Sequence, residues 1–208
     1  MTESNQTLQL AANQQERSKE VLKLAQTCQY DEVHTKQVVQ LALQIFDQLQ
    51  ELLDLGEKEK FYLWCAAYLH DIGIRTEGTK GHHKTALRII LSTPILQLSS
   101  KERLIIGSIA RYHRKTLPKS NHSHFAALED QEKKMVSKVA AVLRIADGLG
   151  YGHKNNIERV KISIHKHKIV FKCKSKRQGI DKELHSATQK SDLLEECISR
   201  KIIFVKDK

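Results

Sequence analysis

The sequence is organised around Ala66-Ala67-Tyr68-Leu69-His70-Asp71-Ile72-Gly73, where an apolar helix ends on an adjacent histidine and aspartate. An imidazole and a carboxylate are both common ligands of divalent cations. Leu63, Ala67 and His70 follow i, i+4, i+7 spacing, and the same spacing one position further on includes Asp71. Both polar side chains are therefore expected on the packed side of the helix. Gly73, with free access to positive φ, is expected to end it.

Composition indicates one globular domain, or one domain with an appendage. The chain has 208 residues, of which 40% are hydrophobic, and no apolar run approaches the roughly 18 residues that span a bilayer. The first residues lack the features of a signal peptide, and the four cysteines are scattered without paired spacing. We therefore expect a cytoplasmic protein with reduced thiols and no membrane partner. The net charge of +11 allows nucleic acid or phosphorylated small molecules as partners without choosing between them.

Helical periodicity recurs along most of the chain, with Asp31 as one expected N-cap and residues 99–102 resembling a capping box. The helices are expected at about 15–28, 32–55, 57–70, 82–93, 100–113, 131–147 and 182–199. Apolar residues alternate with polar ones from 160 and form a second run at 169–171, which predicts a β-hairpin. Residues 202–205 are expected to form a final strand. We expect residues 1–14 to be frayed and 116–130 to be a loop. Residues 1–29 are predicted to be an extension and helix, 30–152 a helical domain, and 153–208 a ββαβ tail packed on it.

Three inward-facing positions could join the His70-Asp71 pair. His34 heads the apolar stripe of the second helix, and Asp147 is in register with Val136, Ala140 and Leu143. A lone histidine is more often a hydrogen-bonded core residue, and Arg144 could be a simple ion-pair partner for Asp147. His113 is the third position, because it falls in line with the apolar residues of its helix. As a set, His34, His70, Asp71 and Asp147 could hold one or two ions of Mn²⁺, Fe²⁺, Zn²⁺ or Mg²⁺.

The order His34, His70-Asp71, Asp147 resembles that of the HD domain, a helical metal-dependent phosphohydrolase fold. More narrowly, four motifs within about residues 30–205 are similar to the C-terminal HD region of the exopolyphosphatase / guanosine pentaphosphate phosphatase (Ppx/GppA) family. These motifs are residues 69–73, 82–84, 111–115 and 143–147. The resemblance implies a mainly α fold, an HD-type helical bundle with a small C-terminal α+β appendage. It also implies that His34, His70, Asp71 and Asp147 are the metal ligands.

By the same resemblance His83, or His82, and His113 would bind a second metal or a substrate phosphate. Full-length members of the family carry exopolyphosphatase chemistry in actin-like ATPase domains that precede this region. Only about 30 residues precede it here, without a glycine-rich phosphate loop, so that activity is not transferred.

The leading hypothesis is a metal-dependent phosphohydrolase acting on a phosphate ester or anhydride, in a nucleotide. The reacting water would be bound to metal held by His70 and Asp71, which lowers its pKa from about 15.7 towards 7. Basic residues near the site would contact the substrate phosphate. They are Arg114, Lys115, Lys84 and Arg75.

Two other hypotheses remain open. One is a non-catalytic regulatory module that binds metal or nucleotide and is related to the same C-terminal domains. The other is nucleic-acid binding through residues 153–177, which hold nine Lys and Arg residues against one acid, Glu158. Few aromatic residues interrupt that run for base stacking. The sequence also leaves a homodimer possible.

Overall fold

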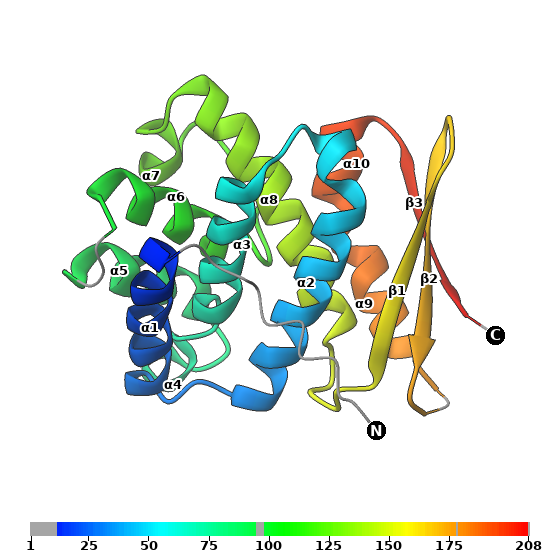
Figure 1. The fold of residues 1–208 in the computed structure, drawn as a ribbon, viewed down its shortest axis with the longest axis horizontal. Helices are drawn as coiled ribbons and strands as arrows, with labels where there is room; N and C mark the ends of the chain where they lie inside the picture. The colour runs from blue at the N-terminus through cyan, green and yellow to red at the C-terminus, as the bar shows by residue number, and fades with distance from the viewer. Residues whose placement is uncertain (1–11, 95–97, 178, 208) are drawn as a thin grey trace.

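The computed structural model describes residues 12–94, 98–177 and 179–207. Helices form the body of the molecule, and a small C-terminal sheet stands at one side of it (Figure 1). The predicted mainly α fold with a small α+β part is therefore confirmed. Residues 1–11, part of the segment predicted to be frayed, lie outside the described residues. Residues 12–14 belong to the first helix instead.

The helices lie close to the ranges that periodicity predicts. They are α1 (Ala12–Thr27), α2 (Glu32–Leu53), α3 (Glu57–Leu69), α4 (Ile74–Glu77), α5 (His82–Ser92), α6 (Ser100–Arg111), α7 (Ser123–Ala126), α8 (Asp130–Leu149), α9 (Asp181–Gln189) and α10 (Asp192–Ile198). Asp31 caps α2 by accepting a hydrogen bond from the backbone N–H of His34, at 3.0 Å. Ser99 and Glu102 form the predicted capping box at the start of α6. Both helix starts therefore lie where the sequence places them.

The core lies among α2, α3, α6 and α8, which pack against one another. Their inward positions are almost all aliphatic, and residues such as Leu41, Leu63, Ile106 and Leu143 have no solvent exposure. Burying these side chains is the main favourable term in folding. The packing brings the start of α2 and the end of α3 to the C-terminal part of α8. This arrangement positions the candidate site.

The sheet has the strand order β1 (Ile157–Ile164), β2 (Lys168–Ser175) and β3 (Lys201–Lys206). The strands β1 and β2 form the predicted antiparallel hairpin, and β3 pairs parallel to β2, with Phe171 opposite Phe204. Figure 1 shows α2 and α9 on the body side of the sheet, and they contact β1 and β3 respectively. The side-chain amides of Gln44 and Gln48 hydrogen-bond to backbone groups of β1. These amides satisfy the edge of β1 that no strand covers.

The single helix predicted at 182–199 is wrong, because two helices, α9 and α10, occupy this segment. Helix α9 ends at Gln189, and α10 begins at Asp192, whose carboxylate accepts a bidentate pair of hydrogen bonds from Arg144 at 2.7 and 2.9 Å. Between them, Lys190 extends to the carboxylate of Asp147. Two polar contacts with α8 thus fix the chain where the helix breaks. The suggested ion pair between Arg144 and Asp147 is also wrong. Arg144 pairs with Asp192, and Lys190 is the partner of Asp147.

All nine basic residues between 153 and 177 have exposed side chains. Across the hairpin, Lys161 lies opposite Lys172 and Arg159 opposite Lys174, while Glu158 forms an ion pair with Lys174 at 3.2 Å. Nucleic-acid binding by this surface stays a prediction, as do the proposed domain boundaries. The four cysteines are free, and no helix among the described residues is long and apolar enough to cross a membrane.

Residues 116–130, predicted to be a loop, contain the short helix α7 and an aromatic cluster. The ring of His124 lies 5.4 Å from that of Tyr112, and His122 Nδ1 lies 2.7 Å from the Tyr112 hydroxyl. Burial, followed by the charge of Arg111, lowers the pKa of His124 from 6.5 to about 4. The cluster therefore favours the neutral ring of His124.

The stability of the protein is expected to depend on His124 in mild acid. Because its pKa is lower in the folded state, its contribution is complete above pH 6.5 and is lost as the pH falls towards 4. One such group gives a slope of at most about 1.4 kcal/mol per pH unit. Between pH 7 and 4.5, the free energy of unfolding in urea should fall less steeply for His124→Phe than for the unaltered protein. Equal slopes would contradict the assignment.

Candidate metal centre

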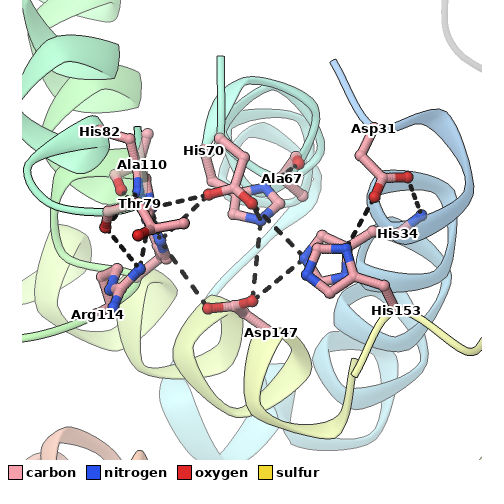
Figure 2. Close-up of polar contacts among 12 residues, drawn as sticks. Asp31, His34, Ala67, His70, Thr79, His82, Ala110, Arg114, Asp147 and His153 are labelled. Atoms are coloured by element: carbon pink, nitrogen blue, oxygen red, sulfur yellow. Dashed lines mark hydrogen bonds and ion pairs between the residues drawn. The ribbon is translucent and has the colours of Figure 1, made fainter. Parts of the chain in front are cut away.

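Six histidine and aspartate side chains from five parts of the chain converge at the centre of the helical body (Figure 2). They are His34 at the start of α2, His70 and Asp71 at the end of α3, His82 at the start of α5, His113 just after α6, and Asp147 near the end of α8. None of the four imidazoles exceeds 2% exposure. The ends of these helices thus place the polar groups in a buried site.

Asp71 lies between two sets of histidines. Its Oδ2 is 3.7 Å from Nε2 of His34 and 3.4 Å from Nε2 of His70. Its Oδ1 is 3.0 Å from Nε2 of His82 and 3.6 Å from Nε2 of His113. One carboxylate therefore faces two imidazole pairs, an arrangement that suits a ligand shared between two cations.

Asp147 faces the same centre from α8. Its Oδ1 is 3.4 Å from Nε2 of His34 and 3.9 Å from Nε2 of His70, and its Oδ2 is 3.9 Å from Nε2 of His113. The potential ligand atoms fall into two groups, each with all atoms within 4.8 Å of one another. The groups are His34, His70 and Asp147, and Asp71, His82 and His113.

Three of the histidines are oriented by a repeated local contact. In each, Nδ1 hydrogen-bonds to the backbone carbonyl three residues earlier: His70 to Ala67 at 2.8 Å, His82 to Thr79 at 3.1 Å, and His113 to Ala110 at 2.7 Å. A neutral imidazole whose proton is on Nδ1 presents a lone pair at Nε2. A hydrogen bond from the other ring nitrogen to a backbone carbonyl is the usual way in which proteins orient metal-binding histidines.

The resulting surroundings favour a cation. Nε2 of His82 lies 3.3 Å from Nε2 of His113, and two lone pairs at that separation repel unless a proton or cation lies between them. Nε2 of His70 and Oδ1 of Asp71 are buried without a hydrogen-bond partner. Buried polar atoms without a hydrogen-bond partner are costly, so the set fits one or two divalent cations.

The charges in the cluster support the same conclusion. Burial alone would raise the pKa of Asp71, but His70 and the other imidazoles hold it well below its usual value. The pKa of Asp147 is likewise depressed despite burial, chiefly by Lys190. Burial lowers the pKa of His70, but Asp71 outweighs this effect and raises it to about 9. Without metal, then, a proton on His70 and the ammonium of Lys190 offset the carboxylates, and metal binding would release that proton.

The other predicted residues lie at different distances from the cluster. Arg114 reaches it, with Nη1 3.4 Å from Nε2 of His82. His83 is buried beside His82, with ring centroids 5.6 Å apart, but belongs to neither ligand group. Lys84, Lys115 and Arg75 are exposed. Within the described part of the chain, these three make no hydrogen bond or ion pair with the six side chains.

Two further residues, His153 and Lys190, contact the cluster without having been predicted from the sequence. The ring of His153 stacks on that of His34 with centroids 3.9 Å apart, and its Nδ1 lies 2.8 Å from a carboxylate oxygen of Asp31. Lys190 contacts Asp147. His153 lies in an irregular loop and Lys190 in a helix break, so neither position had a periodic pattern from which to predict it.

Gly73 is needed for close packing and not, as predicted, for positive φ, since its φ is −81°. A Cβ there would lie 2.3 Å from the backbone oxygen of His82 and 2.9 Å from the side chain of Thr85. The glycine thus allows the end of α3 to approach the start of α5, which places Asp71 beside His82.

Gly73→Ala is therefore expected to destabilise the protein by about 2 kcal/mol, because a methyl group must displace backbone. The shift would also separate Asp71 from His82 and weaken metal binding by the second group. Urea unfolding and metal titration would measure both effects. Gly56→Ala is the control for an added methyl group, because its φ is −125° and the nearest atom to its Cβ, Oε2 of Glu59, would lie at an ordinary 3.5 Å. A Gly73→Ala protein that binds metal as tightly as the unaltered one would contradict this account.

A family model described as Ppx/GppA phosphatase, domain III, matches residues 17–196, which include all six residues of the cluster. No curated protein matches the chain.

Proposed function

The chain belongs to the Ppx/GppA phosphatase domain III family, and from that premise we propose that it is a divalent-metal-dependent phosphohydrolase of HD type. Its substrate would be a nucleotide, in which it would cleave a phosphate ester or anhydride bond. The observation that carries the proposal is the position of Asp71 between two imidazole pairs. Paired cations about 4 Å apart are common in enzymes that cleave phosphate bonds.

In this proposal each ligand group holds one cation. His34, His70 and Asp147 would hold the first, and His82, His113 and Asp71 would hold the second, with Asp71 also facing the first group. Imidazole-rich sets favour Fe²⁺, Zn²⁺ or Mn²⁺, whereas Mg²⁺ prefers oxygen ligands. Cations held there would lower the pKa of a bound water towards 7 and polarise a phosphoryl oxygen.

The protein's own residues would bind and orient the substrate. Arg114 contacts His82 and Lys190 contacts Asp147, so a phosphoryl group beside the cluster meets positive charge from both. Such charge stabilises the oxygens of a phosphoryl group during transfer. Because the histidines are held by backbone carbonyls, the ligands need little rearrangement before they act.

A non-catalytic module that binds metal or nucleotide is the alternative, since the same six side chains could serve a sensor. The two functions differ in turnover. We would measure the metal content of the purified protein by mass spectrometry and then screen nucleotides and simple phosphoesters for phosphate release with added Mn²⁺. One or two ions per chain with turnover support the enzyme, and metal without turnover supports the sensor. A site that stays empty after Mn²⁺ addition refutes the enzyme and the metal sensor, and leaves only a module that binds nucleotide without metal.

A further inference from the structure

A trough lies between the loop that follows α8 and the start of α9. Its volume is about 780 Å³, and a neighbouring hollow of about 420 Å³ shares Tyr151, Asp181 and Lys182 with it. Ligand sites for small molecules and cofactors typically measure about 300–1,000 Å³. The trough is thus large enough for a nucleotide.

The trough borders the metal cluster at two points. His153 lines it, and the ring of His153 stacks on that of His34, as Figure 2 shows. At the other end, Gln189 lines the neighbouring hollow, and the next residue, Lys190, contacts Asp147. A molecule in the trough would therefore lie one side chain away from two of the candidate ligands.

The charges that line the trough favour an anion. Lys154, Arg177 and Lys182 contribute exposed cationic side chains, and within the described residues none of them forms an ion pair. Asp181, one of the two acids in the lining, is already neutralised by Lys206 at 2.8 Å. Three cations without a carboxylate partner suit a ligand that carries phosphate.

The remaining lining suits a nucleoside. Tyr151 is 53% exposed, which leaves a ring face available, and base–aromatic stacking does not require a particular base. Glu183, the second acid, is only 6% exposed, and none of the described residues donates a hydrogen bond to its carboxylate. The carboxylate is thus free to accept hydrogen bonds from a ligand in the trough, and ribose hydroxyls are common partners of acids in nucleotide sites.

We propose that this trough binds the nucleoside part of a ribonucleotide. The base stacks on Tyr151, Glu183 accepts hydrogen bonds from the ribose hydroxyls, and Lys154, Arg177 and Lys182 contact phosphate. The proposal rests on the proposed function only for the reaction at the adjacent cluster, because binding in the trough needs no turnover. It assigns substrate recognition to the C-terminal α+β part of the chain.

Calorimetric titration of the full chain with AMP in EDTA tests binding apart from hydrolysis. Tyr151→Ala should weaken binding roughly tenfold through lost stacking. Tyr151→Phe, the matched control, should keep it. Glu183→Gln should reduce the preference for AMP over deoxy-AMP, and circular dichroism would show that this buried variant is folded. Unchanged affinity in Tyr151→Ala, or equal losses in Tyr151→Ala and Tyr151→Phe, would overturn the proposal.

Turnover gives an independent readout. In the active enzyme, Tyr151→Ala should raise KM for a nucleotide by a larger factor than KM for glycerol phosphate, because glycerol phosphate has no base to stack on the ring. If neither substrate is cleaved while AMP binding still depends on Tyr151, the proposed hydrolysis fails and the binding site stands. If both are cleaved equally by variant and unaltered protein, the binding site fails and the phosphohydrolase stands.

Discussion

Asp71→Asn is expected to remove metal from both ligand groups and to abolish phosphate release. Asp71 is the residue whose two oxygens face four imidazoles, at 3.0–3.7 Å, so no single other ligand can replace it. The amide keeps the size of the side chain but removes its charge and one acceptor. Loss of an outer-shell partner alone costs about 10–100-fold in metal affinity or activity, and a shared ligand should cost more. Metal content and phosphate release, measured on the same preparation, check the prediction.

Asp47→Asn is the matched control, because Asp47 makes the same kind of ion pair with Lys60, at 2.7 Å, away from the cluster. This variant should bind metal and turn over substrate as the unaltered protein does. Asp71→Asn that retains metal and turnover would refute the site. If the unaltered protein shows no turnover and Asp71→Asn loses the metal, the sensor would be the better description.

The sequence located the residues of the cluster that lie on regular helices. His34, His70 and Asp147 were predicted from their register with apolar neighbours, and the structure brings them within one group. Helical register is a reliable guide here because a polar residue on a buried stripe must face the core. The helix ranges follow from the same periodicity, since long amphipathic segments fill most of the chain.

The rest of the site depends on tertiary contacts that local patterns do not contain. His82 and His83 are adjacent and both buried, so burial alone could not show that His82 faces Asp71. His153 and Lys190 contact the cluster from a loop and a helix break. The break itself was missed because residues 182–199 read as one amphipathic helix. Its position is set by partners on α8 that lie about 45 residues away in sequence.

The largest effect on stability is expected at Arg144, which joins α8 to two other parts of the fold. Its side chain is 3% exposed, donates three hydrogen bonds to the carboxylate of Asp192 and donates a fourth to the backbone carbonyl of Tyr112 at 3.1 Å. Arg144→Ala leaves that carbonyl unpaired and frees the start of α10. Charged hydrogen bonds contribute about 1.5–3 kcal/mol each, and the 43% exposure of the Asp192 side chain lets water offset part of this loss. We therefore expect a loss of about 3 kcal/mol in urea unfolding.

The substitution should affect the metal cluster as well as the free energy of unfolding. Tyr112 directly precedes His113, and α10 follows Lys190. Arg144→Ala is thus expected to weaken metal binding by the second group even in conditions where the protein stays folded. Arg88→Ala, which removes an exposed arginine from a 3.6 Å pair with Glu77, should change neither property. A double-mutant cycle with Asp192→Asn isolates the pair, and we expect the combined loss to fall well short of the sum of the two single losses. Additive losses would show that Arg144 stabilises the fold through its packing and its contact with Tyr112, and that α10 is held without it.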